Sequence, residues 1–434
     1  MIAKLLLDKK REGHALGSAE IREFIEGFTR GEIPDYQMAA MAMAICCRGM
    51  NERETADLTE AMMKSGRCLE WDVLTADKHS TGGVGDKLSL VIQPLASVCG
   101  VAVPSLTGRG LGITGGTADK LETIPGFSCS QTLERFQEIT KDVGVCLAVQ
   151  TDEITPADKK LYALRDVTGT VASIPLITGS ILSKKLAEGS GTLVFDVKCG
   201  RGAFMKTPDE ARALAQSLVS GAKAAGRRSA ALITCMDAPL GYAVGNANEV
   251  AEALAILEPG NAAGERCAWI ADLCVEFAAL MVSLAREMPL DEARELCRTR
   301  LKDGSAYDRF VTMIRAQGGD LERFRELLGH PTFKFRIQSM RSGIVSSIDA
   351  EKVARVALAL GAGREKTGDR IDPLAGVTLS VKTGDSIVVG QPLATLEKAS
   401  DPDGLERAAA DLYKAFQISP SASEIRPLIL ERIV

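Results

Sequence analysis

The chain has 434 residues, a formal net charge of −5 and a pI near 5.6. This length exceeds the size at which one hydrophobic core keeps growing, so we expect two or three domains. The acidic balance and the lack of a basic run exclude a nucleic-acid-binding surface, and an aromatic content of 4% leaves little for base stacking. With 41 glycines and many alanines, the composition suits helices packed closely on a sheet and predicts an α/β fold.

The first 65 residues have a helical pattern throughout. We expect a first helix to Glu12, a second from Ser18, a third over 37–47 and a fourth that opens at Asn51. Asn51 and Glu54 have the spacing of a capping box, which marks the start of the fourth helix. The third helix is apolar nearly all round, so it should lie either at the centre of a bundle or in a subunit interface.

Beyond residue 74, apolar segments of strand length alternate with helical segments. This alternation is typical of βαβ units and predicts a mainly parallel sheet. A helical interruption over 156–188 resembles the N-terminal segment, and we assign it to the same domain. From about residue 335 the composition shifts to Val, Ile, Gly and Asp with turn signals. The predicted domains are a helical domain (1–65 and 157–190), an α/β domain (74–150 and 191–330) and a small β-rich C-terminal domain (335–434).

The cysteines and the N-terminus point to a compartment. Eleven scattered cysteines, mostly in apolar segments, are typical of buried thiols in a reducing environment. His14, His79 and His330 are too dispersed to predict a zinc site by spacing, so no metal is expected. The first residues carry charge too early for a signal peptide, and no apolar run approaches membrane-spanning length. We therefore expect a cytoplasmic protein with no membrane partner.

Two glycine-rich stretches could hold an anion. Residues 78–86, KHSTGGVGD, predict a strand end, a tight turn and a helix start, where backbone N–H groups and the helix dipole favour a phosphate. The alternative is a structural turn with a solvated lysine, but such a turn needs no histidine between a lysine and a serine. Residues 107–122, TGRGLGITGGTADKLE, contain a G-x-G-x-x-G run, yet they lack the early βα context of a dinucleotide site. Two such loops suggest two walls of one site.

The helical interruption carries further candidates. Ser180 and Lys184 are four residues apart, so on a helix they share one face, and Arg165 precedes them. A hydroxyl and an ammonium that face a cleft could bind the edge of a polar, planar ligand. A solvated lysine beside a helix-start serine stays open as the alternative.

These stretches, together with several shorter ones, resemble the thymidine and pyrimidine nucleoside phosphorylases over nearly the whole chain. The resemblance implies a helical and an α/β domain on either side of a cleft that closes on substrate, in a homodimer joined through the helical domains. It also implies reversible phosphorolysis of a pyrimidine nucleoside, with inorganic phosphate as co-substrate and no cofactor. The further segments that carry it are 162–166 (YALRD), 173–178 (SIPLIT), 196–198 (DVK), 202–205 (GAFM) and 245–247 (GNA).

The resemblance also implies roles for individual residues. Phosphate would be held by Lys78, Ser80, Ser89, Thr107 and Thr117. The base would be held by His79, Arg165, Ser180 and Lys184, of which His79, Arg165 and Lys184 would be catalytic. Arg165 and Lys184 would offset negative charge on the departing base, and His79 would donate a proton or a hydrogen bond to it.

Four positions depart from the family pattern. Thr107 stands where serine is usual, Ile113 where histidine is common, and Ser105 where a methionine near the base is frequent, so the preferred base is open. One branch of the family has a monovalent cation beside Gly85, residue 87 and a glutamate. Here residue 87 is lysine, and we hypothesise that the Lys87 ammonium replaces the cation and pairs with Glu249.

Two rival functions remain at this stage. A phosphoribosyltransferase of the anthranilate type shares the two-domain layout, although no paired-aspartate motif for magnesium lies beside the loops. A non-catalytic nucleoside-binding relative is the other, with Ile113 and Ser105 as signs of lost activity.

Overall fold

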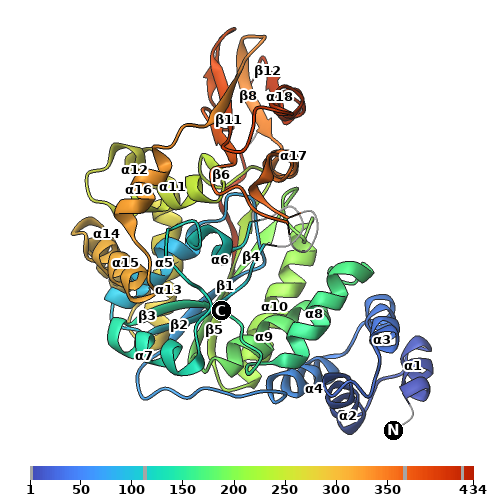
Figure 1. The fold of residues 1–434 in the computed structure, drawn as a ribbon. Helices are drawn as coiled ribbons and strands as arrows, with labels where there is room; N and C mark the ends of the chain where they lie inside the picture. The colour runs from blue at the N-terminus through green and yellow to red at the C-terminus, as the bar shows by residue number, and fades with distance from the viewer. Residues whose placement is uncertain (1–2, 111–114, 365–368, 422–424) are drawn as a thin grey trace.

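The computed structural model describes residues 3–110, 115–364, 369–421 and 425–434. The chain forms a helical domain, a larger α/β domain and a small β-rich domain formed mainly by the C-terminal part (Figure 1). In the view of Figure 1 the helical domain lies at the lower right and the C-terminal strands at the top. This confirms the predicted fold class.

The helical domain combines the first helices with two later ones. One hydrophobic cluster joins them through residues such as Phe28, Met41, Leu58, Leu161 and Leu176. The Asn51 side chain accepts a hydrogen bond from the Glu54 amide (2.9 Å) and Glu54 returns one, so the capping box is confirmed. The helices are α1 (Ala3–Arg11), α2 (Ser18–Thr29), α3 (Asp35–Arg48), α4 (Glu52–Met63), α8 (Pro156–Thr168) and α9 (Ile174–Ala187).

The central sheet is parallel apart from its last strand. The order β1-β4-β5-β13 is extended on the other side by β2-β3, because Thr75 forms a parallel bridge with Ala102. β4 is buried along its whole length, as expected for a strand covered on both faces. The strands are β1 (Ala76–Ser80), β2 (Val103–Thr107), β3 (Val145–Val149), β4 (Thr192–Cys199), β5 (Arg228–Cys235) and the antiparallel β13 (Ile429–Ile433).

Helices cover this sheet on both faces. Thr207 caps the longest helix of the crossover connections through a hydrogen bond from the Glu210 amide. The helices of the α/β domain are α5 (Leu88–Val98), α6 (Thr117–Leu121), α7 (Leu133–Val143), α10 (Pro208–Ala224), α11 (Ala247–Leu257), α12 (Ala262–Arg266), α13 (Ala268–Arg286), α14 (Leu290–Lys302), α15 (Ser305–Ala316) and α16 (Leu321–Leu328).

α13 corrects one expectation from the sequence. Within the described residues it is the one helix long and apolar enough to cross a membrane, so the statement that no apolar run approaches that length is wrong. Most of this helix is buried, and it packs against β1, β4, α5 and α14. A core helix surrounded by other elements needs apolar residues on nearly all sides, which explains its composition.

The C-terminal part builds two small antiparallel sheets, β6-β9-β11-β7 and β10-β8-β12. β6 comes from the α/β segment, whereas β13 returns from the end of the chain to the central sheet, so two strands cross the predicted boundary near residue 335. The elements are β6 (Ala243–Gly245), β7 (Phe333–Gln338), β8 (Gly343–Ile348), α17 (Ala350–Ala357), a π-helical turn (Leu358–Ala362), β9 (Gly376–Leu379), β10 (Ser386–Ile387), β11 (Pro392–Lys398), α18 (Leu405–Tyr413) and β12 (Phe416–Ser419).

Candidate functional site

Four hydroxyl groups mark the carboxyl edge of the central sheet. Ser80 ends β1 and Thr107 ends β2, while Ser89 and Thr117 lie in the first turns of α5 and α6. All four residues are half-buried. The hydroxyls of Ser89, Thr107 and Thr117 form no hydrogen bond with another described residue, whereas Ser80 donates to Asp86 (2.7 Å). In parallel α/β sheets this edge is where ligands bind, so these hydroxyls are available to an anion.

The two glycine-rich stretches lie against each other. The Lys120 ammonium on α6, in the second stretch, donates to the Asp86 carbonyl of the first (2.7 Å), and within the second stretch the Ala118 amide donates to the Gly108 carbonyl (3.3 Å). Gly85 has φ +69°, and a Cβ there would lie 2.4 Å from the Leu240 carbonyl oxygen, so the first turn requires glycine. The structure therefore places both loops at one edge of the sheet, as two walls of a shared site require.

Lys78 lies beneath the first glycine turn in a buried cluster of charges. Its ammonium pairs with Asp196 (3.0 Å), and Lys198 pairs with the same carboxylate (2.7 Å); all three side chains are fully buried. Burial favours the neutral amine of Lys78, but the Asp196 and Asp86 carboxylates outweigh it and raise the pKa of Lys78. Burial also opposes ionisation of Asp86, yet the ammonium groups of Lys198, Lys78 and Lys120 lower its pKa. The predicted phosphate contact of Lys78 stays a prediction, because here its partner is Asp196.

Sequence reasoning gave no role to Asp196 or Lys198. Both lie on β4, and the pairing of β1 with β4 aligns Ser80 with Asp196, so these polar groups meet across two buried parallel strands. Asp196 and Lys198 could have been identified from the sequence as charged residues in an otherwise apolar strand. A charge buried in such a strand requires a partner.

Lys184 and Ser180 share one face of α9, as their spacing predicts. The Lys184 ammonium donates to Ser180 Oγ (2.9 Å) and pairs with Asp158 of α8. The Lys184 side chain is 17% exposed and Ser180 lies in the middle of the helix, so the alternative of a solvated lysine beside a helix-start serine is wrong. Burial lowers the pKa of Lys184, although Asp158 opposes this.

Asp158 is a further residue that sequence reasoning missed. Asp158, Tyr162 and Arg165 lie on α8 at positions i, i+4 and i+7, which is the spacing of one helix face. This spacing could have identified Asp158 from the sequence. The Tyr162 ring centroid lies 5.5 Å from the Lys184 ammonium. Asp158 Oδ1 is buried without a hydrogen-bond partner among the described residues. This carboxylate fixes the position of the Lys184 ammonium.

The Arg165 guanidinium binds the turn between α8 and α9. It donates to the carbonyls of Thr170 (3.2 Å), Val171 (2.8 Å) and Leu176 (2.9 Å), and the residue is buried. Burial lowers its pKa. In this structure Arg165 therefore stabilises the start of α9, and its predicted contact with the base stays a prediction.

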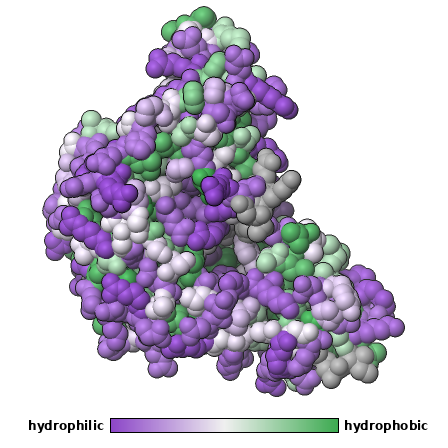
Figure 2. Space-filling model, in the orientation of Figure 1, coloured by the Kyte–Doolittle hydropathy of each residue, from purple (hydrophilic) through white to green (hydrophobic). Residues whose placement is uncertain are grey.

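His79 lies at the end of β1, on the α/β side of the site. The imidazole is half-buried and forms no hydrogen bond with another described residue. Burial, followed by the ammonium groups of Lys185, Lys184 and Lys78, lowers the pKa of His79 well below 6.5. His79 of the α/β domain and Lys184 of the helical domain thus act on each other electrostatically. Figure 2 shows the surface hollowed on the side where the helical domain meets the rest of the molecule.

We expect the imidazole of His79 to stay neutral from pH 8 down to pH 6. Because the folded pKa of His79 lies below 6.5, the protein loses stability as the pH falls below about 6.5, where the unfolded chain binds a proton that the folded imidazole does not, and this loss levels off below the folded pKa. In ¹³C-labelled protein the His79 resonance, assigned with the His79→Asn variant, should not move over this range. A titration midpoint at or above pH 6.5 would contradict the environment described here.

Three of the departures from the family pattern can be located. Lys87 pairs with Glu252, so the expected pair with Glu249 is wrong; Glu249 instead pairs with Lys120 (2.8 Å). Glu249 and Glu252 are three residues apart on α11, and only the packing decides between them. Ser105 is buried and accepts a hydrogen bond from Gln93 (3.2 Å). Thr107 presents its hydroxyl at the end of β2, and Ile113 lies outside the described residues.

Comparisons with known proteins identify the family. Residues 4–66 match the helical bundle domain and residues 72–307 the a/b domain of the glycosyl transferase family, and residues 344–419 match the pyrimidine nucleoside phosphorylase C-terminal domain. The pyrimidine-nucleoside phosphorylase of Geobacillus stearothermophilus is 44% identical, with 99% of each chain covered. The chain belongs to the thymidine and pyrimidine nucleoside phosphorylase family. Thymidine phosphorylase of Mycobacterium tuberculosis is 44% identical over 100% of this chain and 98% of its own.

A solved structure outside this family shares the fold. Anthranilate phosphoribosyltransferase from Thermus thermophilus aligns with a TM-score of 0.58 and 21% identity, and covers 73% of this chain and 99% of its own. At this identity the likeness concerns the fold alone. The alignment covers nearly all of that enzyme but leaves part of this chain without a counterpart.

Proposed function

We propose that the protein catalyses the reversible phosphorolysis of pyrimidine nucleosides. Thymidine, uridine or 2-deoxyuridine and inorganic phosphate would give the free base and ribose or deoxyribose 1-phosphate. A phosphate oxygen attacks the anomeric carbon, the bond from that carbon to the base nitrogen breaks, and its electron pair leaves with the base. The proposal depends above all on the Lys184 ammonium of the helical domain, which Asp158 and Ser180 hold in place and which lies close enough to His79 of the α/β domain to help lower its pKa.

The hydroxyl cluster supports binding of phosphate at the α/β side. Ser89, Thr107 and Thr117 offer hydroxyls without another described partner, and the first turn of α5 adds backbone N–H groups with the favourable end of the helix dipole. Thr107 keeps the hydroxyl that serine would supply, so we expect phosphate binding to survive this departure. No enzyme nucleophile and no cofactor are needed, because phosphate itself attacks.

The pair of Ser180 and Lys184 supports binding of the base on the helical side. An ammonium held by Asp158 and Ser180 is preorganised to offset negative charge that develops on the base carbonyls. The neutral imidazole of His79 can donate a hydrogen bond from an N–H to the same ring. Closure of the two domains would bring phosphate and nucleoside within attack distance and exclude water.

Incubation with phosphate and a panel of nucleosides tests the proposal. We expect phosphate-dependent release of free base from thymidine, uridine or 2-deoxyuridine, and none from purine nucleosides, by chromatography of the products. The rival phosphoribosyltransferase would instead need a phosphoribosyl diphosphate and Mg²⁺. Release of base without added phosphate, or no release from any pyrimidine nucleoside, would contradict the proposal and leave the nucleoside-binding alternative.

We further propose a homodimer that forms through the helical domain. α3 exposes Tyr36 (74%), Ala40, Met43 (44%) and Cys47, which recur at positions i, i+4, i+7 and i+11 on one face. The sequence left two places for this apolar helix, a bundle centre or a subunit interface, and none of the described residues covers this face of the helix. Light scattering should give twice the chain mass.

We also propose a cytoplasmic location and a role in nucleoside salvage. All eleven cysteines are free thiols, as expected in a reducing compartment.

A further inference from the structure

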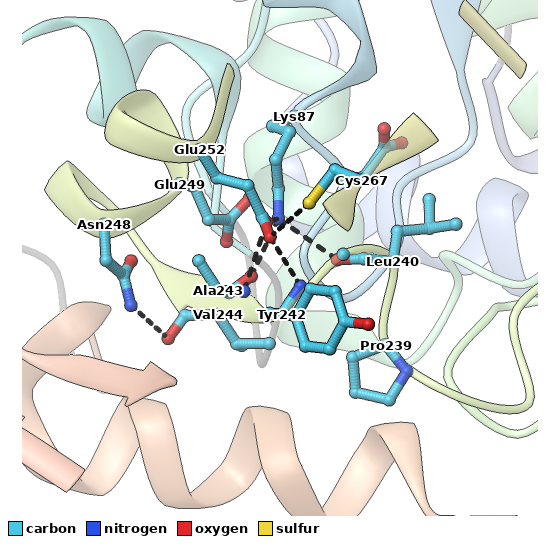
Figure 3. A network of polar contacts seen from close by, with 12 residues as sticks. Lys87, Pro239, Leu240, Tyr242, Ala243, Val244, Asn248, Glu249, Glu252 and Cys267 are labelled. Carbon is cyan, nitrogen blue, oxygen red and sulfur yellow. Dashed lines mark hydrogen bonds and ion pairs between the residues drawn. The ribbon is translucent and has the colours of Figure 1, made fainter. Parts of the chain in front are cut away.

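The ammonium of Lys87 is enclosed by three oxygen atoms. It donates to the carbonyls of Leu240 (3.1 Å) and Ala243 (2.9 Å) and pairs with the Glu252 carboxylate (Figure 3). Its side chain is fully buried. A lysine ammonium has three N–H donors, so these partners satisfy all of them. Two peptide carbonyls and one carboxylate form an oxygen donor set of the kind that binds hard cations.

The surrounding groups keep this lysine charged. Burial favours the neutral amine, but the carboxylates of Glu252 and Glu249 outweigh it and raise the pKa of Lys87. Burial likewise opposes ionisation of Glu252, and Lys87 lowers its pKa. The Cys267 thiol, whose pKa burial raises to about 12, stays neutral and donates to Glu252 (3.2 Å). The site therefore contains one positive and one negative group in contact.

The loop that supplies the carbonyls supports the first glycine turn. The Leu240 amide donates to the Val84 carbonyl (3.0 Å), and Leu240 O is the atom that a Cβ on Gly85 would meet. A Cβ on Gly241 would lie 2.7 Å from the Lys87 ammonium, so the loop closes tightly over it. On the outer side, Lys382 of the C-terminal domain donates to the carbonyls of Pro239 (2.7 Å) and Gly241 (2.8 Å). Lys87 and Lys382 thus bind four carbonyls of one loop, those of residues 239, 240, 241 and 243.

The family resemblance implies a monovalent cation beside Gly85 and residue 87, and the residues present do not fit a free ion. The Lys87 ammonium takes the carbonyls of Leu240 and Ala243 and the Glu252 carboxylate, and it would repel a second positive charge in contact with it. Glu249, the glutamate of the family pattern, pairs with Lys120 instead (2.8 Å). We propose that Lys87 is a covalently tethered replacement for the cation, so that the loop over 239–243 is held against the glycine turn without bound potassium.

Removal of the tethered charge should restore a potassium site. Wild-type protein and Lys87→Ser, which leaves the carbonyls and Glu252 in place, are compared in choline chloride and in potassium chloride of equal ionic strength. We expect Lys87→Ser to bind stoichiometric potassium by atomic emission and to gain roughly 5 °C in Tm with potassium. The wild type should retain no potassium and show the same Tm in both salts. Neither measurement needs turnover, so the result is independent of the proposed phosphorolysis.

Two further variants control the experiment. Lys87→Met fills the space with an uncharged chain, so its Tm should fall and should not recover with potassium. Lys159→Ser removes a surface lysine that is 52% exposed, and it should behave as the wild type in both salts. Stoichiometric potassium in the wild type, or a Lys87→Ser variant that is indifferent to potassium, would overturn the proposal. If Lys87→Ser is recovered in neither salt, the potassium content and Tm of the wild type decide.

Discussion

Replacement of Lys184 by methionine should lower kcat/KM for the preferred pyrimidine nucleoside by about 10²–10³-fold, or roughly 2.7–4 kcal/mol of transition-state stabilisation. The ammonium is held in place by Asp158 and Ser180, so no reorganisation is needed when negative charge develops on the base. Methionine keeps much of the side-chain volume and removes the charge together with the N–H donors to Asp158 and Ser180. Steady-state kinetics with phosphate and nucleoside varied separately gives the measurement, and the loss should fall on kcat at least as much as on KM of the nucleoside.

Lys159→Met is the matched control for this variant. Lys159 lies on α8 in the same domain, but its side chain is 52% exposed and pairs with Asp152 at the surface. Its removal should change kcat/KM by less than a factor of about two, as expected for an exposed ion pair of small energy. Normal turnover of pyrimidine nucleosides by Lys184→Met would remove Lys184 from the mechanism.

Replacement of Asp196 by alanine should destabilise the α/β domain by about 3–5 kcal/mol. Asp196 is the partner of both Lys78 and Lys198, and Thr234 donates a hydrogen bond to it (2.6 Å). Without its carboxylate, two ammonium groups stay buried and keep the more distant Asp86 carboxylate as compensation. Because the chain has several domains, differential scanning calorimetry should show which transition shifts to lower temperature.

Asp209→Ala separates this effect from the loss of an ordinary ion pair. Asp209 pairs with Arg212 at the surface and its side chain is 92% exposed, so the variant should unfold within about 0.5 kcal/mol of the wild type. A similar Tm for Asp196→Ala and the wild type would show that the buried lysines lose their charge at little cost, contrary to the role assigned to Asp196.

Local interactions explain which parts of the fold could be predicted. The capping groups of α4 and α10 depend on residues three apart, and β2, β3 and β5 are short, largely apolar runs, so both could be located from the sequence. The exchange of β6 and β13 across the boundary near residue 335 depends on pairing between distant segments. No local pattern specifies such a pairing, which is why it was missed.

The candidate site divides in the same way. The contact of Ser180 with Lys184 follows from helix geometry alone, and it could be predicted. The partner of Lys87 could not, because Glu249 and Glu252 lie on the same helix and the choice depends on how α11 packs against α5 and α6. Likewise, two of the three carbonyls that Arg165 binds come from the turn after α8, whose course no side-chain pattern fixes, and the third comes from the first turn of α9.

The position of β13 affects how the protein is made. This strand pairs with β5 along the edge of the central sheet, and Glu431 on it forms an ion pair with Arg212 of α10 (2.9 Å). The ribosome therefore has to synthesise residues 236–428 before the edge of β5 can be covered. Until then a nascent chain exposes the unpaired backbone groups of β5. We expect chaperones to protect the growing polypeptide at this edge, and incomplete chains to aggregate through it.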